Sequence, residues 1–400
     1  MLDAYIYDGL RSPFGRYVGA LATVRPDDLI ATVIKALVEK HQLPSDVFDE
    51  VLLGSANQAG EDSRNIARNA ALLAGLDVTT SGQTVNRLCA SGLSTVVDAA
   101  RSITCHEGDI ILAGGVESMT RAPFVFAKTE KPFSRDFKVF DTTIGSRFPN
   151  PKIIEQFGSD TMPQTGDNVA HKYGITREEA DKFAAASQAK YQAAKQAGFF
   201  DDEITPITVP QGKKLPEKVV TDDEHPRASS DIAALQKLKP LNENGIVTAG
   251  NASGINDGAA ALIIGSKQAE KKLGFKPIAK ILSSGAMGVE PNIMGVGPVE
   301  AIKLALKRAN LTLDDMSVIE INEAFASQVL GCLKGLDIDF DDKRVNPNGG
   351  AIAVGHPLGA SGARIALSTA RELQRTGGKY AVVSLCIGIG QGLAMVIERV

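Results

Sequence analysis

The hydrophobic pattern of this chain occurs twice, about 270 residues apart. Segments 93–103 and 363–373 each carry small or apolar residues at successive steps of 3, 1, 3 and 3 positions, which form one stripe along an α-helix. The triplet Ala-Ser-Gly stands before both stripes, at 90–92 and 360–362, and a continuous apolar run follows each stripe. Those runs are "DIILAGG" at 109–115 and "KYAVVSLC" at 379–386. Each copy therefore predicts a helix followed by a buried strand.

The duplication extends upstream of both stripes. Helical and strand patterns within 29–54 align, at an offset of 268, with a helix over 299–308 and a strand over 317–322. Each half then reads helix, strand, loop, helix, strand, which predicts an α/β fold with buried mixed sheets flanked by helices. Chance similarity between two α/β segments is the alternative, but within each aligned stretch the identities and spacing agree without gaps.

The segment between the two halves has a different character. Residues 120–248 are rich in charge and turns, as in "EKPFSRDFK" and "TDDEHPRASSD", with one clear helical pattern over 176–198. We assign 1–119 with 249–270 to an N-terminal core half and 271–400 to a C-terminal core half. The segment 120–248 is then an insertion, which we expect to lie over the N-terminal half and to carry functional loops.

Composition and charge narrow the function. A net charge of −4 gives no reason to expect nucleic-acid binding, and the absence of tryptophan argues against a stacking surface. Four scattered cysteines do not form a disulfide framework, which favours a reducing compartment. No apolar run reaches the roughly 18 residues that span a bilayer, and the N-terminus lacks a signal-peptide pattern. We predict a cytoplasmic protein without membrane or nucleic-acid partners.

The heptapeptide "NRLCASG" at 86–92 carries the first candidate for chemistry. Its Cys89 stands directly before a predicted helix, where unpaired N–H groups and the helix dipole favour a thiolate. The small residues that follow leave room for a substrate. A buried structural cysteine is an equally good interpretation of these seven residues alone.

Three stretches of the C-terminal half change that balance. Asn322 begins "NEAFA" at a strand end, His356 lies in the glycine-rich "NPNGGAIAVGHPLGASG", and Cys386 begins "CIGIGQG". Duplicated halves place matching strand and helix ends against each other, so these residues and Cys89 are expected to converge. A cysteine beside a histidine gives an activated thiol, and a second cysteine gives a separate proton donor and acceptor.

These four motifs resemble, in order and from the first strand to the last residue, the signatures of thiolases, the coenzyme A-dependent acyltransferases. The resemblance implies the thiolase fold: two duplicated halves with mixed five-stranded sheets, stacked in αβαβα layers, plus an inserted loop domain that binds coenzyme A. It also implies a homotetramer built as a dimer of dimers, with 57–71 near the dimer contact.

The resemblance further implies a role for each catalytic residue. His356 takes the proton of Cys89, whose thiolate attacks the 3-keto carbonyl, and Cys386 protonates the departing carbanion. One oxyanion site is His356 with a water held by Asn322. The other consists of the backbone N–H groups of Cys89 and Gly388.

Coenzyme A is expected as a co-substrate, with no permanently bound cofactor and no metal. By resemblance, Ser253 and Met162 line the pantetheine arm and Arg227 lies near the nucleotide. The remaining histidines stand in polar contexts, without the spacing of metal ligands, and are expected to be exposed: His41, His106, His171 and His225.

The substrate is suggested by "NQAGEDSRNIAR", "GGVESMTRAPFV" and "DTTIGSRF", which are closest to the branch that cleaves 3-oxoadipyl-CoA to succinyl-CoA and acetyl-CoA in aromatic degradation, the β-ketoadipate pathway. The free carboxylate of that substrate needs a cation, for which Arg121, Arg135 and Arg147 are candidates. An acetoacetyl-CoA or broad 3-ketoacyl-CoA thiolase is the nearest alternative. Decarboxylating condensing enzymes typically use two active-site histidines, and a non-catalytic coenzyme A-binding protein would lack one of the three reactive residues.

Overall fold

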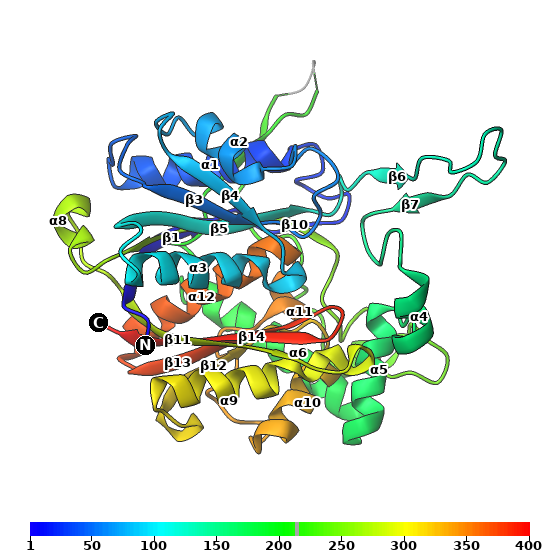
Figure 1. Ribbon diagram of the computed structural model, residues 1–400. Helices are drawn as coiled ribbons and strands as arrows, with labels where there is room; N and C mark the ends of the chain where they lie inside the picture. The colour runs from blue at the N-terminus through cyan, green and yellow to red at the C-terminus, as the bar shows by residue number, and fades with distance from the viewer. Residues whose placement is uncertain (213–215) are drawn as a thin grey trace.

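The computed structural model of the chain describes residues 1–212 and 216–400. Figure 1 shows five stacked layers in the core, in which two sheets alternate with three layers of helices. The strands of the N-terminal half lie in the order β4 (Ser81–Val85), β3 (Glu50–Gly54), β5 (Ile110–Ser118), β10 (Asn256–Gly265) and β1 (Ala4–Arg11). Those of the C-terminal half lie in the order β12 (Met316–Ile321), β13 (Tyr380–Ile387), β14 (Gln391–Arg399) and β11 (Ala279–Gly288). The αβαβα prediction is confirmed.

Both sheets are mixed, as predicted. β3 runs parallel to β4 and β5, and β10 runs antiparallel to β5 and β1. In the second half β12 is parallel to β13, and β14 is antiparallel to β13 and β11. The two sheets also meet at one end, where Ala4–Ile6 of β1 pairs with Ala279–Ile281 of β11.

The C-terminal sheet has four regular strands where five were expected. A single parallel bridge between Ile319 and Val345 stands where the fifth strand would lie. The next residue, Asn346, explains the interruption, because its side chain accepts a hydrogen bond from Ile321 N and donates one to Ile321 O. The amide thus satisfies backbone groups that a longer strand would pair.

The central layer consists of the two helices of the duplication, α3 (Ser91–Thr104) and α12 (Leu358–Thr376). Both predicted apolar stripes are buried in one core cluster that also includes residues from both sheets. The outer layers are α1 (Pro26–Lys40) and α2 (Ile66–Leu73) on the N-terminal sheet, and α9 (Gly297–Ala309) and α10 (Ala326–Leu336) on the other side. The reactive loops are therefore carried by the most enclosed helices.

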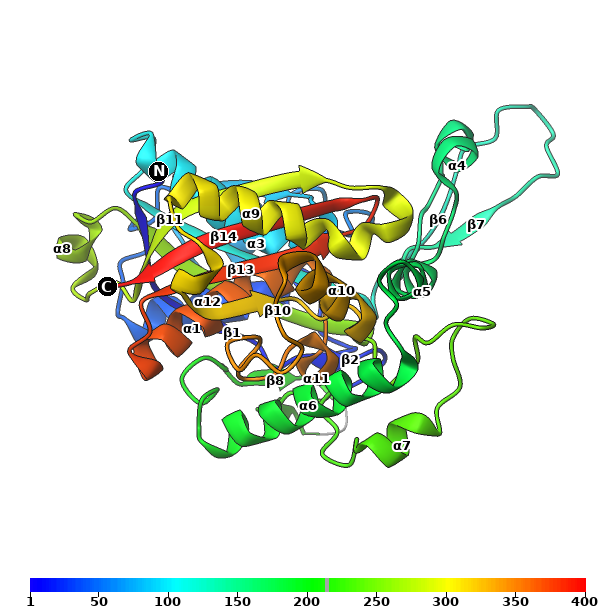
Figure 2. The ribbon, with the colours of Figure 1, turned by 90° about the horizontal axis from the view of Figure 1, so that it is seen from below.

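The insertion was expected over the N-terminal half, and this is only partly correct. The short strands β8 (Ile207–Val209) and β9 (Lys218–Val220) contribute to the N-terminal core. The helices α5 (Met162–Tyr173) and α6 (Arg177–Gln196) instead pack into the core of the C-terminal half. Figure 2 shows the hairpin of β6 (Phe124–Phe126) and β7 (Val139–Asp141) projecting from the body, next to α4 (Pro151–Phe157). The remaining elements are η1 (Leu88–Ala90), α7 (Ile232–Gln236), α8 (Ala269–Leu273), η2 (Pro291–Val296), η3 (Leu313–Asp315), α11 (Ala351–Val354) and β2 (Gly15–Arg16).

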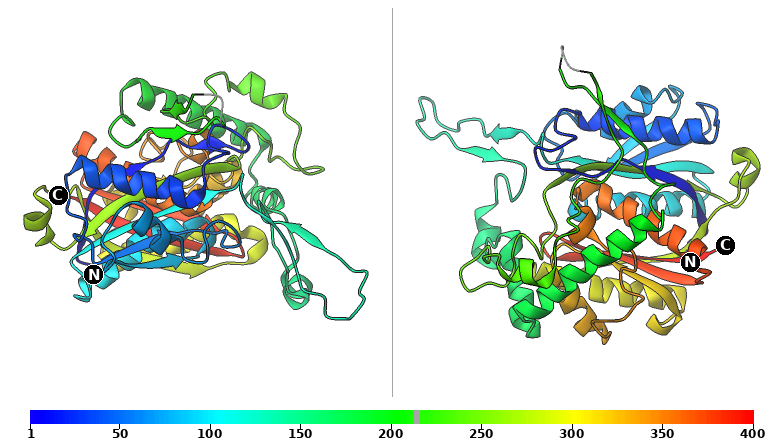
Figure 3. Two further views of the ribbon diagram at one scale, coloured as in Figure 1. Left: turned by 90° about the horizontal axis from the view of Figure 1, so that it is seen from above. Right: turned by 180° about the vertical axis from the view of Figure 1, so that it is seen from behind.

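A buried ion cluster fastens this insertion to the core. The guanidinium of Arg11, on β1, contacts Glu203 at 2.7 Å and Asp223 at 2.6 Å, and all three side chains are fully enclosed. The hydroxyl of Tyr191, on α6, donates to Asp223. Removal of one partner would leave a buried charge unpaired, so the cluster restrains how the insertion lies on the core. Figure 3 shows the green ribbon of the insertion against the core in two further views.

Candidate active site

The starts of α3 and α12 lie against each other and against the ends of two paired strands. A Cβ at Gly92, in α3, would lie 2.5 Å from the carbonyl oxygen of Gly359, in α12. Gly54 and Gly115 are partners across β3 and β5, and a Cβ on either would overlap with one of these helix starts. Glycine at these positions allows backbone to meet backbone, so the two predicted reactive loops are held at one place.

Cys89 lies in the short 3-10 turn η1 that leads into α3, as its position before the helix predicted. The preceding residue, Leu88, has a φ of 47°, a conformation that bulky residues rarely adopt. Ser91 supports the turn, since its Oγ accepts from Arg87 N at 2.9 Å and donates to Leu88 O at 2.7 Å. The strained turn presents the thiol at the junction of the two halves.

The resting thiol is not the thiolate that its place before a helix suggested. Burial raises the pKa of Cys89 to about 11, and the carboxylate of Glu117 adds to the rise. The backbone N–H groups of Gly388 and of Cys89 itself lower the pKa and act in the opposite direction. Desolvation outweighs these local donors, so burial is the larger influence on the pKa of the resting thiol.

Cys386 and Gly388 reach the thiol from the end of β13. Cys386 is buried, and its pKa is raised by that burial and by the adjacent Cys89. A Cβ at Gly388 would lie 3.3 Å from Leu88 Cδ1 and 3.9 Å from the sulfur of Met162. The structure thus brings Cys89, Cys386, Gly388 and Met162 together.

His356 is held in one orientation by both ring nitrogens. Nδ1 lies 2.6 Å from Ser361 Oγ, whose own proton goes to Pro357 O at 3.1 Å. We assign the proton of His356 to Nδ1, because Ser361 Oγ then accepts from Nδ1–H, and this tautomer leaves Nε2 without a proton. Nε2 faces Asn322 Nδ2 at 3.4 Å. The ring is thus a neutral tautomer whose free lone pair can accept a proton.

The surroundings of His356 keep it neutral. Its backbone N–H donates to Asn256 Oδ1, and the residue before it, Gly355, has a φ of 106°. Burial lowers the pKa of His356 to about 3, and the nearby guanidinium of Arg364 contributes to the lowering. An imidazole with this pKa is uncharged near neutral pH.

Asn322 directly follows β12 and is buried beside the imidazole. Within the described ranges 1–212 and 216–400, its Oδ1 is enclosed and has no hydrogen-bond partner. A buried acceptor of this kind is suited to a bound water, which would present a proton toward the reaction centre.

Of the three residues predicted to contact coenzyme A, two lie near the reactive loops and one does not. Ser253 N donates to Ala324 O, which places Ser253 beside the "NEAFA" loop. Met162, the first residue of α5, is part-exposed next to Gly388. Arg227 lies on the surface, where its backbone N–H donates to Gln188, and no described contact joins it to the reactive residues.

Two of the four other histidines are not exposed, contrary to expectation. His41 is half-buried, bonded to Asp8 at 2.7 Å and stacked on Phe275. His225 lies against Gly254, and burial lowers its pKa to about 4. In the part of the chain that the structure describes, no cluster of three potential metal ligands occurs and no helix is both long and apolar enough to cross a bilayer.

Sequence reasoning missed three residues that shape this site. Asn256 holds the backbone of His356, and Ser361 fixes its tautomer. Glu117, on β5, accepts from the first turn of α12. Ser361 belongs to the duplicated triplet, which could have indicated a role. The other two act through contacts between distant segments, which leave no local pattern.

Comparison with known proteins identifies one family over almost the whole chain. Residues 4–268 match the family described as thiolase, N-terminal domain, and residues 275–399 match thiolase, C-terminal domain. The chain is 55% identical to the β-ketoadipyl-CoA thiolase of Acinetobacter baylyi over the full length of both. It is 52% identical to the 3-oxoadipyl-CoA/3-oxo-5,6-dehydrosuberyl-CoA thiolase of Escherichia coli, again over both full lengths. The crystal structure of human mitochondrial 3-ketoacyl-CoA thiolase in complex with CoA superposes with a TM-score of 0.91 at 40% identity, covering 100% of this chain and 98% of that one.

Proposed function

The chain belongs to the thiolase family of acyltransferases, and from that premise we propose that it cleaves 3-oxoadipyl-CoA with coenzyme A into succinyl-CoA and acetyl-CoA. The observation that carries the mechanism is the neutral His356, whose unprotonated Nε2 lies at the junction with two protonated thiols. This is the protonation state from which a thiol can be deprotonated and a carbanion protonated.

In the first half-reaction His356 Nε2 takes the proton of Cys89, and the thiolate attacks the C3 carbonyl carbon of the substrate. The N–H groups of Cys89 and Gly388, which converge on the sulfur, are placed to stabilise a tetrahedral oxyanion there. The C2–C3 bond then breaks, and the electron pair remains on C2, next to the thioester carbonyl.

Cys386 supplies a proton to C2, which releases acetyl-CoA and leaves a succinyl thioester on Cys89. Protonated His356 and a water bound to Asn322 Oδ1 stabilise the enolate oxygen before that proton arrives, commonly by several kcal/mol. In the second half-reaction Cys386 takes the proton of the incoming coenzyme A thiol. That thiolate attacks the succinyl carbonyl, and Cys89 leaves and regains its proton from His356.

Coenzyme A, as co-substrate, is expected to lie between the insertion and the core. Met162 and Ser253 support this position, because they border Gly388 and the "NEAFA" loop respectively. Arg227 is proposed to meet the nucleotide end, where its exposure suits contact with phosphates.

The dicarboxylic substrate is supported by the names of the full-length relatives at 51–55% identity. Its carboxylate requires a cation, and the three candidate arginines differ in availability. Arg121 is held by Glu61 through two contacts of 2.6 Å, and Arg135 is exposed between β6 and β7. Arg147 is half-buried and donates to Asn57, and among the described residues no carboxylate forms an ion pair with it. We therefore assign the carboxylate to Arg147.

The test compares kcat/KM for 3-oxoadipyl-CoA and for acetoacetyl-CoA at one coenzyme A concentration. We expect at least a tenfold preference, about 1.4 kcal/mol, for the dicarboxylic substrate. Arg147→Gln should lower the ratio of kcat/KM for the two substrates by about 10- to 100-fold, whereas Arg121→Gln should leave that ratio unchanged. Equal rates in the unaltered enzyme would keep the mechanism and favour a broad 3-ketoacyl-CoA thiolase, of which the human mitochondrial relative is 41% identical.

We also infer that the enzyme is a cytoplasmic homotetramer. All four cysteines are free, as in a reducing compartment. The hairpin and the segment after it expose large apolar side chains, the kind of surface that subunits cover: Phe124, Phe126, Phe133, Phe137, Val139, Ile144 and Phe148. The molar mass in solution, by light scattering, tests the assembly, and a monomer would contradict it.

A further inference from the structure

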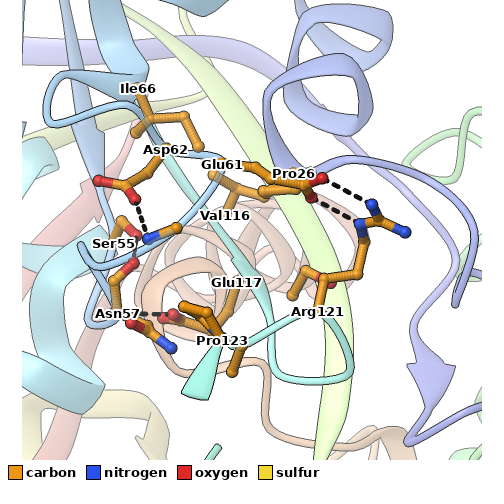
Figure 4. A pocket seen from close by; sticks show the side chains of 13 residues that line it. Pro26, Ser55, Asn57, Glu61, Asp62, Ile66, Val116, Glu117, Arg121 and Pro123 are labelled. Atoms are coloured by element: carbon orange, nitrogen blue, oxygen red, sulfur yellow. Dashed lines mark hydrogen bonds and ion pairs between the residues drawn. The ribbon is translucent and has the colours of Figure 1, made fainter. Parts of the chain in front are cut away.

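Glu117 is a buried carboxylate that contacts both the segment after β3 and the start of α12. It lies on β5 with 3% of its surface exposed, and its side chain accepts only backbone N–H groups. Oε1 accepts from Asn57 N at 2.9 Å, and Oε2 accepts from Ala56 N at 3.0 Å and from Gly359 N at 2.8 Å. Figure 4 shows Glu117 with Asn57, while the ion pair of Arg121 with Glu61 occupies another side of the same pocket.

Two of the three partners of Glu117, Ala56 and Gly359, lead toward the reactive residues. The carbonyl of Ala56 accepts from Asn86 Nδ2 at 3.0 Å, and Asn86 lies three residues before Cys89. Gly359 belongs to the first turn of α12, three residues after His356. A carboxylate at a helix start satisfies an N–H group that has no partner within the helix, and it also interacts favourably with the helix dipole.

We propose that Glu117 is a positioning residue of the proposed thiolase reaction, since its carboxylate joins the lead-in to Cys89 to the start of α12 and thereby fixes how the thiol meets the imidazole. The close contacts of the surrounding glycines fit this role. A Cβ at Gly359 would lie 2.5 Å from Val116 O and 2.7 Å from Gly54 O, so α12 begins directly on the two strands. Such a backbone contact has no side chains of its own to set its register, and Glu117 supplies that restraint.

The charge of Glu117 has a second consequence. It raises the pKa of Cys89, whereas burial raises the pKa of Glu117 itself. The residue therefore orients the thiol and at the same time opposes its ionisation in the resting enzyme. Substitutions can separate these two effects, because Glu117→Gln removes the charge and Glu117→Asp keeps the charge but shortens the side chain.

The experiment measures kcat and the rate of Cys89 alkylation against pH, by peptide mass spectrometry, in the full-length enzyme. Both variants should lose about 10- to 100-fold in kcat, the range expected for a misplacement near 1 Å. Only Glu117→Gln should shift the alkylation profile to lower pH. Glu61→Gln, in the same pocket but without contact to either loop, is the control and should change neither quantity.

The positioning role of Glu117 and the proposed function would be contradicted by different results. A kcat within twofold of the unaltered enzyme in Glu117→Gln and Glu117→Asp would overturn the positioning role. So would losses that follow only the melting temperature, with an unchanged alkylation profile. If instead acetyl transfer from acetyl-CoA to Cys89 is absent in the unaltered enzyme, the proposed function fails, whatever the variants do.

Discussion

The two copies of Ala-Ser-Gly begin equivalent helices and serve opposite chemical roles. In the first copy the residue before the triplet is Cys89, and in the second it is Gly359, since 89 + 270 = 359. In the first copy the N–H at this position belongs to Cys89 itself and lowers the pKa of its thiol. In the second it is taken by Glu117. One helix start thus carries the candidate nucleophile, and the other is anchored to β5 by a buried carboxylate.

The serines of the two triplets show the same division. Ser91 bonds only to backbone, at Arg87 and Leu88, and so supports the turn that carries the nucleophile. Ser361 bonds to Pro357 O and to the ring of His356, and so fixes a base. The residue that matches His356 in the first copy is Asn86, since 86 + 270 = 356, and it bonds to backbone only. Where the first copy has Asn86, the histidine of the second copy gives the triplet serine a ring to orient, which is the role that the proposed mechanism assigns to Ser361.

The largest effect is expected from removing the nucleophile. Cys89→Ser should abolish the acyl-enzyme and lower thiolysis by at least about 10⁴-fold, because no other described thiol is similarly accessible at the junction. Mass spectrometry after incubation with acetyl-CoA gives the acylated fraction. A fully active Cys89→Ala enzyme would show that Cys89 is not the nucleophile, and the contrast between the two helix starts would then fail.

The next effect separates the two thiols. Cys386→Ala should still accept an acetyl group on Cys89 but lose carbon–carbon bond cleavage by about 10²- to 10⁴-fold, since the carbanion then lacks its proton donor. Acylation and thiolysis are measured on the same preparation. Loss of both reactions together would place Cys386 in acylation as well.

The paired serines offer a sharper test of moderate size. Ser361→Ala should lower kcat about 10- to 100-fold, because the ring loses the acceptor that sets its tautomer and orientation. Ser91→Ala should cost about 1 to 2 kcal/mol in unfolding free energy, with a smaller change in kcat, because backbone groups lose their partner. Equal losses of kcat in the two variants would remove the distinction between the copies.

The last prediction concerns stability at low pH and not the rate of the reaction. The pKa of His356 is about 3 in the folded protein, below the ordinary value of about 6.5, so unfolding at intermediate pH takes up a proton. The stability from the neutral ring is present above about pH 6.5 and is lost as the pH falls toward 3, by up to about 1.4 kcal/mol per pH unit. His356→Asn, which gives the second copy the residue of the first, should weaken this dependence in urea unfolding. An unchanged acid dependence would show that other groups govern it.

Much of the fold could be predicted because the duplication is recorded in local patterns. The apolar stripes placed α3 and α12, and the runs after them placed β5 and β13, because helix and strand periodicities depend on neighbouring residues. The missing fifth strand was not predictable in this way. The strand is interrupted because the side chain of Asn346 bonds to the backbone of Ile321. That contact joins two segments that are separate in sequence, so no local pattern records it.

The same limit separates the predicted from the missed parts of the site. Cys89, His356, Cys386 and Asn322 stand at element ends, where the structure places Cys386 beside Cys89 and Asn322 beside His356. The pKa of Cys89 moves against the sequence expectation because the helix start is local, whereas the burial that outweighs it comes from the opposite half. Glu117 was missed for the same reason, since its three partners lie on two segments far from it in sequence.

The most direct test of the account is ¹⁵N NMR of the resting enzyme with labelled histidine, in which the signal of His356 is assigned by comparison with His356→Asn. We predict a neutral ring, protonated at Nδ1 and free at Nε2, at every pH between about 5 and about 8. A ring protonated at Nε2, or an imidazolium paired with a Cys89 thiolate near neutral pH, would contradict the claim that Ser361 holds His356 ready to accept the proton of Cys89.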